Sequence, residues 1–131
     1  MSGYALSATV ERPFADTLEA TRQALAQQGF GVLTEIDLAA TLKTKLDVDL
    51  APQVILGACR PPLAYAAVQA EPSIGLLLPC NVVVRAADET TTLVEAMDPD
   101  AMVTLTANVE LRGVADEART LLAAALESLN T

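Results

Sequence analysis

The sequence predicts an α+β fold: one domain spanning residues 1–131, with a mixed or antiparallel sheet of about five strands and helices packed on it. Two observations lead to this prediction. Short apolar runs typical of strands alternate with stretches in which apolar residues recur every three or four positions, as in amphipathic helices. The 131 residues suffice for one hydrophobic core, and a composition that is 52% hydrophobic but only 3% aromatic makes that core aliphatic.

The chain begins with a strand and a helix. Residues 4–10 alternate loosely between apolar and small polar side chains, which is typical of a strand. Pro13 suits the first turn of a helix, and Gly29 suits its end. The buried face of this helix is expected to consist of residues spaced by four, three and four positions: Phe14, Leu18, Thr21 and Leu25.

A second strand, a short helix and a third strand are expected next. Residues 30–36 form the second strand, and Asp37 is a good N-cap for the helix that follows. After a loop, residues 53–58 form the third strand. The apolar face of the short helix is expected to carry Leu38, Leu42 and Leu46.

Residues 54–84 form the centre around which the chain is organised. They contain both cysteines and four of the seven prolines. Pro61 and Pro62 open a short helix, and Pro72 closes it. Residues 74–87 are then predicted to form a long apolar strand, bent where Pro79 lacks a backbone donor.

The last third of the chain completes the order β-α-β-α-β-α-β-β-α-α. Residues 91–97 are expected to pair with the preceding strand as a hairpin. Asp98 and Pro99 look like the start of a short helix, and Asn108 like the cap of the final helix. The buried stripe of that final helix is predicted to be Val114, Ala118, Leu121, Ala125 and Leu129.

Charge and composition exclude several classes of function. The net charge of -9, from 8 basic and 17 acidic residues, disfavours nucleic acid and anionic membranes as partners. The absence of histidine excludes Ser-His and Cys-His dyads within the chain and imidazole metal ligands. Neither a signal peptide nor a membrane-spanning segment is evident, so we expect a cytoplasmic protein with free thiols.

Cys59 is the sharpest candidate for chemistry. It stands where a strand meets the start of a helix, and Arg60 follows it. Backbone N–H groups at a helix start and a neighbouring cation both favour a thiolate, the form that attacks disulfides, accepts sulfur or binds soft metals. The alternative is that Cys59 is a small buried apolar residue. The prolines at 61 and 62 lack N–H groups, which leaves only later amides for an anion.

Cys80 and Asn81 complete the candidate thiol or ligand site. Cys80 either fills space in a strand or serves as a second, resolving thiol for Cys59. Asn81 is a polar residue within an apolar strand and needs a hydrogen-bond partner if it is buried. Even combined with carboxylates such as Glu71, two cysteines make a poor zinc site, so no metal is expected. No residue is assigned a catalytic role, and no cofactor is identified.

Two stretches of the sequence resemble the domain of unknown function 302 family. They run Gly-Ala-Cys-Arg-Pro-Pro-Leu-Ala over 57–64 and Gly-Leu-Leu-Leu-Pro-Cys-Asn-Val-Val-Val over 75–84. Arg60 stands where the family often has asparagine. If this position touches a ligand, the preference for that ligand is expected to differ in this chain. Flanking features of the family are similar at Gly29-Phe30-Gly31-Val32, Lys43-Lys45-Leu46 and Asp98-Pro99 with Met102.

The resemblance implies a single α+β domain that forms a homodimer, and it implies no settled activity. Three hypotheses therefore stay open. The first is sulfur or redox chemistry at Cys59 and Cys80. The second is a binding module that encloses a small molecule, a metal or haem near the two cysteine-containing stretches. The third is a structural or interaction role in which both cysteines are core residues and the central strands form the dimer interface.

Overall fold

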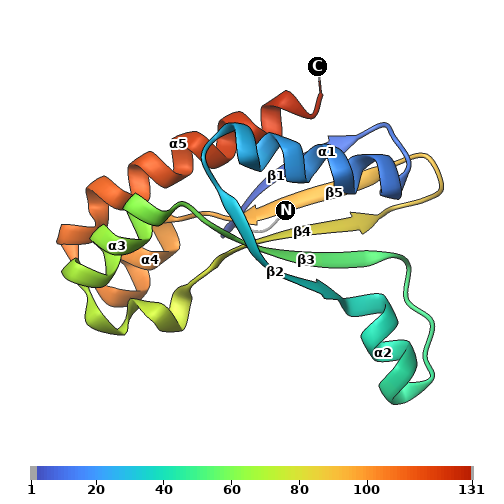
Figure 1. Cartoon of the computed structure of the whole chain (residues 1–131), viewed down its shortest axis with the longest axis horizontal. Coiled ribbons are helices and arrows are strands. Elements are labelled where there is room, and N and C mark those ends of the chain that lie inside the picture. Colours follow the sequence, from blue (N-terminus) through green and yellow to red (C-terminus); the bar gives the residue numbers. More distant parts are fainter. Residues whose placement is uncertain (1–2, 131) are drawn as a thin grey trace.

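A five-stranded sheet runs through the molecule (Figure 1). The computed structural model describes residues 3–130. The strands are β1 (Ala5–Val10), β2 (Gly31–Asp37), β3 (Gln53–Cys59), β4 (Cys80–Ala86) and β5 (Thr92–Met97). They lie in the order β1-β5-β4-β3-β2, and every neighbouring pair is antiparallel. The predicted α+β class with five strands is confirmed.

Two long helices cover one face of this sheet, and shorter ones gather at its ends. The α-helices are α1 (Phe14–Gln27), α2 (Leu38–Leu46), α3 (Pro61–Ala70), α4 (Asp100–Thr106) and α5 (Arg112–Ser128). Two 3₁₀ turns, η1 (Pro72–Leu77) and η2 (Val109–Leu111), complete the structure. Helices α1 and α5 pack against each other and against the sheet, while α3 and α4 lie beside the other end of α5 (Figure 1).

The main core lies between the sheet and the pair α1 and α5. Successive side chains of a strand point to opposite faces, so the register aligns apolar residues in rows across the sheet. One such row is formed by Ala8, Val94, Val84 and Val54, all of them buried. Burying each Val or Leu contributes roughly 1.5–3 kcal/mol. The prediction of an aliphatic core is confirmed.

The opposite face of the central strands is only partly covered. Its middle carries Ile55, Val83 and Leu93, which are half-buried. On the same face Arg85 of β4 faces Glu95 of β5, with 3.2 Å between Nε and Oε1.

The predicted strand over 74–87 is wrong in its first half. Residues 72–77 form the 3₁₀ turn η1, and β4 begins only at Cys80. Pro72 starts the turn, and the Ile74 amide donates to the carbonyl of Glu71. This turn buries Ile74 completely, in a second core cluster with Ala67, Met102, Leu111 and Ala115. The apolar run therefore reaches its core through a helical turn, which strand patterning does not reveal.

Capping residues mark the starts or ends of several helices. Asp37 caps α2 by accepting a hydrogen bond from the Ala40 amide at 2.9 Å, as predicted. Gly29 has φ 84°, which confirms its role at the end of α1. Asn108 caps the turn η2 rather than α5 itself, because the chain makes one 3₁₀ turn before α5 begins.

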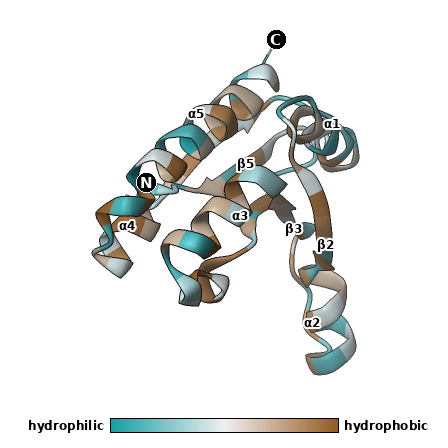
Figure 2. Ribbon diagram, turned by 60° about the vertical axis from the view of Figure 1, so that its left-hand side comes forward, coloured by the Kyte–Doolittle hydropathy of each residue, from teal (hydrophilic) through white to brown (hydrophobic). Residues whose placement is uncertain are grey.

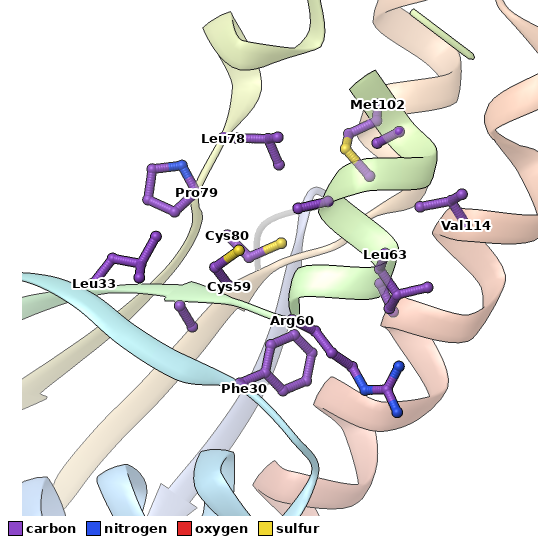
Figure 3. Close-up of a pocket in the computed structure, with 14 residues that line it drawn as sticks. Phe30, Leu33, Cys59, Arg60, Leu63, Leu78, Pro79, Cys80, Met102 and Val114 are labelled. Carbon is purple, nitrogen blue, oxygen red and sulfur yellow. The ribbon is translucent and has the colours of Figure 1, made fainter. Parts of the chain in front are cut away.

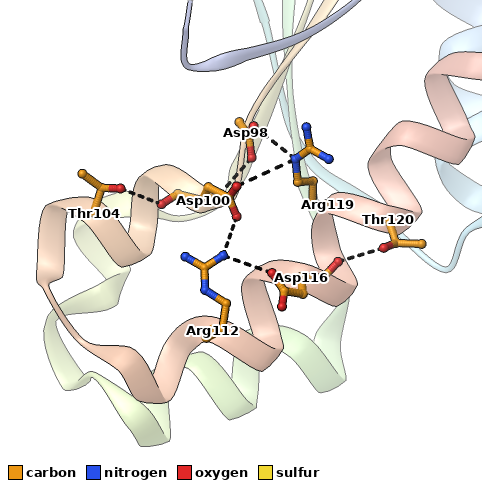
Figure 4. Close-up of polar contacts among 7 residues, drawn as sticks. All are labelled: Asp98, Asp100, Thr104, Arg112, Asp116, Arg119 and Thr120. Atoms are coloured by element: carbon orange, nitrogen blue, oxygen red, sulfur yellow. Dashed lines mark hydrogen bonds and ion pairs between the residues drawn. The ribbon is translucent and has the colours of Figure 1, made fainter.

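An ion-pair network joins α4 to α5 (Figure 4). Arg112 lies between Asp100 at 2.8 Å and Asp116 at 3.1 Å, and Arg119 lies 3.2 Å from Asp98. Exposed pairs contribute about 0–1 kcal/mol each, but a network of several fixes relative geometry. The network therefore positions α4, which carries Met102, against α5.

Among the helices built from residues 3–130, none combines the length and the apolar character needed to cross a bilayer.

Candidate functional site

A pocket of about 280 Å³ opens at the end of the sheet where β3 stops and β4 begins. It lies between these strand ends, the start of β2 and the helices α3, α4 and α5 (Figure 3). Its lining consists of Phe30, Leu33, Ala58, Cys59, Arg60, Leu63, Ala64, Ala67, Leu78, Pro79, Cys80, Met102, Val114 and Ala118.

The lining is almost entirely hydrocarbon and sulfur. Arg60 is its one charged residue, and no other lining side chain carries a nitrogen or oxygen atom. Three lining residues contribute sulfur atoms: Cys59, Cys80 and Met102. A site of this make-up can hold an apolar molecule and offers few hydrogen bonds to a polar one.

Small side chains create the space. Four alanines line the pocket, from β3, α3 and α5: Ala58, Ala64, Ala67 and Ala118. Larger residues at these positions would fill the volume, as Leu and Val do in the core beneath the sheet. The alanine content of the sequence thus has a local consequence here, because it leaves a cavity where three helices meet the sheet.

Arg60 is held at the edge of the pocket by groups outside it. Its Nε donates to the carbonyl of Gln28 at 3.3 Å, and its Nη1 lies 3.4 Å from Glu117 of α5. A Cβ on Gly29 would come within 3.0 Å of the Arg60 Nε, so glycine there gives the guanidinium its path. The charge of Arg60 is therefore already paired with an acidic partner.

The backbone amides at the start of α3 are also in use. Pro61 and Pro62 have no N–H, and the amides of Leu63 and Ala64 both donate to the carbonyl of Arg60 at 3.0 Å. The two amides that the sequence left available for an anion are therefore not free. The reason is that the carbonyl of Arg60 accepts both of them.

The surroundings of Cys80 favour the neutral thiol over the reactive thiolate. Burial raises the pKa of its thiol, and the nearby Cys59 raises that pKa further, so the neutral thiol is favoured. Both cysteines are free. Cys80 pairs across the sheet with Ala58, one position out of register with Cys59, so the two cysteines are not a cross-strand pair. The structure gives no support to a disulfide between them.

Three of the four predicted site residues line the pocket, and the fourth does not. Asn81 is exposed, pairs with Gly57 and is not part of the lining. Sequence reasoning missed Phe30, Met102 and the α5 residues Val114 and Ala118. Phe30 and Met102 lie within the flanking stretches that resemble the family, whereas nothing in the sequence connects α5 with this site.

No group of three or more Cys, Asp or Glu side chains that could hold a metal ion occurs within residues 3–130. The pocket itself offers thiols and a thioether without a carboxylate.

Fold and site together define an α+β protein in which an antiparallel five-stranded sheet carries an apolar, sulfur-lined pocket at its end. Residues 6–129 match the model of a family described as domain of unknown function DUF302, and the chain belongs to this family.

A solved structure supports the same assignment. The crystal structure of an uncharacterized conserved DUF302 protein from Bacillus stearothermophilus superposes with a TM-score of 0.90. The two sequences are 28% identical, and the match covers 98% of this chain and 100% of the other. A search of the curated proteins found no match.

Proposed function

We propose that this protein binds a small, uncharged, apolar molecule in the pocket between β3, β4 and α3. The observation that carries the proposal is the lining: hydrocarbon and sulfur throughout, with one charged group that is already paired. A pocket of this kind with few polar groups is the usual make-up of a ligand site.

The volume sets the size of the ligand. An apolar cavity of about 150 Å³ binds benzene. At about 280 Å³ this pocket has room for a substituted or fused aromatic ring. Sulfur atoms make favourable contacts with aromatic rings. Cys59, Cys80 and Met102 therefore favour an aromatic ligand over a saturated one.

Arg60 disfavours a charged ligand. An incoming carboxylate would lie beside the Glu117 carboxylate, which already pairs with this guanidinium, and the rest of the pocket offers no side-chain donor to offset its desolvation. A neutral molecule avoids both the repulsion by Glu117 and the desolvation of a charge.

Sulfur or redox chemistry is the weaker alternative. In its favour, both thiols line one pocket. Against it, the amides at the start of α3 are occupied, Arg60 is paired with Glu117, and burial raises the pKa of Cys80. None of these features generates a thiolate.

The test is calorimetric titration with indole and with toluene. Ala64→Leu places a larger side chain in the pocket, and Ala66→Leu on the same helix makes the same change at a position outside the lining. We expect the wild type and Ala66→Leu to bind indole and Ala64→Leu to lose at least tenfold in affinity. Absence of binding to both probes, or equal binding by the two variants, would contradict the proposal.

A further inference from the structure

Residues 61–78, which comprise α3 and the turn η1 and are hereafter called the lid, leave the sheet between two neighbouring strands. Adjacent antiparallel strands such as β3 and β4 are commonly joined by a hairpin loop of about two to five residues. Here the chain departs at the end of β3 and returns at the start of β4, where Ala58 pairs with Cys80. Figure 2 shows α3 between α4 and β3. The two attachment points of the lid are therefore next to each other.

The lid contributes nothing to the main core. Only two of its residues are buried, Ala67 and Ile74. Both belong to the second core cluster, with Met102 of α4, and no residue of 61–78 belongs to the main cluster between the sheet and the helices α1 and α5. Segments with few buried apolar contacts open at a lower free energy than the core does. The sheet therefore does not depend on the lid for its own packing.

The pocket lies between the lid and the main core. The lining residues that the lid contributes are Leu63, Ala64, Ala67 and Leu78. Phe30 and Ala58, which belong to the main core cluster, line the same pocket. Lining atoms that face a cavity lack dispersion contacts on that side. A molecule in the pocket supplies these contacts to the lid and to the main core at once.

Asn108 fastens the far end of the lid. Its Nδ2 donates to the Ala70 carbonyl and to the Glu71 carboxylate, both at 2.9 Å. At the other end, Arg60 precedes the lid and is held outside it, by the Gln28 carbonyl and by Glu117 of α5. Arg60 therefore marks a fixed point about which the lid can turn, whereas the bonds of Asn108 must break when the lid opens.

We propose that the lid opens as one unit, separately from the sheet, and that a ligand in the pocket holds it closed. Opening separates Ala67 and Ile74 from Met102 and breaks the bonds of Asn108, while the strands stay paired. The second half of the proposal rests on the proposed function. A ligand that contacts both sides only in the closed state stabilises that state by mass action.

Native-state hydrogen exchange without any ligand tests the separate opening. The amides of α3 are compared with the slowest amides of β3 and β4 at rising denaturant within the folded range, in the wild type, Asn108→Ala and Thr92→Val. Thr92→Val is the matched control, because it also removes one polar side chain's hydrogen bond. The Thr92 hydroxyl donates to the Arg12 carbonyl at 2.8 Å, at the end of the sheet away from the pocket.

In the wild type we expect α3 to exchange faster than the strands and with a weaker dependence on denaturant, because lid opening exposes less surface than global unfolding. Asn108→Ala should speed the exchange of α3 by about two- to tenfold, which corresponds to the loss of roughly one net hydrogen bond. Thr92→Val should speed only the strand amides. Exchange of α3 at the strand rate in the wild type, or equal acceleration of α3 by both variants, would overturn the proposal.

Indole then tests whether a ligand holds the lid closed, at concentrations set by the Kd that calorimetry gives. Exchange of the α3 amides should slow by a factor of one plus the ratio of the indole concentration to Kd. Indole that binds without slowing this exchange would contradict closure by the ligand. If indole does not bind, the proposed function fails with it, while the separate opening of the lid stands or falls on the ligand-free result.

Discussion

Gly57 is a backbone position packed closely against a residue that lines the pocket. It is buried in β3, and a Cβ added there would overlap the Thr34 hydroxyl and approach the Pro79 ring to 2.8 Å. Both neighbours come from adjoining strands or their ends, and Pro79 lines the pocket. The close approach therefore requires the smallest residue.

Gly57→Ala is expected to lower the free energy of unfolding by about 1–3 kcal/mol, the usual effect of overpacking. Gly113→Ala is the matched control, because nothing lies within 4 Å of the added methyl and alanine favours the helix α5. Chemical denaturation measures both variants. Equal free energies of unfolding for the two variants would show that β2 and Pro79 move aside for the added methyl group without loss of stability.

Cys80 is expected to resist alkylation at neutral pH. Burial raises the pKa of its thiol, so the reactive thiolate becomes abundant only at pH values above the range of an ordinary thiol. Since the folded pKa exceeds the unfolded one, ionisation opposes folding, and the stability that Cys80 contributes at lower pH is lost as pH rises through the folded pKa.

Mass spectrometry of iodoacetamide-treated Cys59→Ser reads Cys80 alone. The labelling rate of the native variant should lag behind that of the urea-unfolded variant at pH 8 and catch up as pH rises. Equal native and unfolded rates at pH 8 would contradict the assigned burial.

The three residues Cys59, Arg60 and Cys80, which the sequence grouped together because proline and cysteine mark both stretches, all line one pocket. The surroundings of these side chains could not be predicted from the sequence. Whether the arginine is paired depends on partners distant in the chain, here Gln28 and Glu117. Local spacing contains no such information.

At the scale of elements, the caps of η2 and α2 differ in how much of the core depends on them. The Asn108 Oδ1 accepts from the Glu110 amide, and its Nδ2 donates to the Ala70 carbonyl and the Glu71 carboxylate at 2.9 Å. It thus joins the end of α3 to the approach of α5, beside the second core cluster. Asp37 caps α2, which buries nothing.

Asn108→Ala is expected to lower the free energy of global unfolding by about 0.5–1.5 kcal/mol, because the half-buried Ala70 carbonyl and Glu71 carboxylate lose a hydrogen bond each. Asp37→Ala should change the free energy of global unfolding by less than about 0.5 kcal/mol while increasing amide exchange within α2. Denaturation and hydrogen exchange separate the two effects. A loss of global stability in Asp37→Ala would mean that α2 supports the core.

Elements bounded by proline, glycine or a capping residue could be predicted. The prediction of a strand over 74–78 was wrong because that stretch is ambiguous in principle. Residues 74–78 form an apolar run that suits a buried strand or a helical turn equally well. Burial of Ile74 against Met102 and Leu111 selects the turn, and those residues lie about 30 positions further along the chain.

At the scale of the whole molecule, the strand pattern predicted the sheet but could not predict its order. Placing β5 between β1 and β4 depends on long-range pairing, for example of Ala8 with Val94. The same limit applies to the pocket, since α5 reaches it only because it packs across the sheet beside α1.

The central claim is that the pocket at the end of the sheet binds an apolar ligand. NMR of the protein with ¹³C-labelled methionine methyl groups, titrated with indole, tests it most directly. Met102 lines this pocket, whereas Met97 lies in a different surface hollow and is an internal control. We predict a saturable shift of the Met102 methyl signal, abolished by Ala64→Leu, with the Met97 signal unmoved. An unchanged Met102 signal at millimolar indole, or equal shifts of both methionines, would contradict the claim.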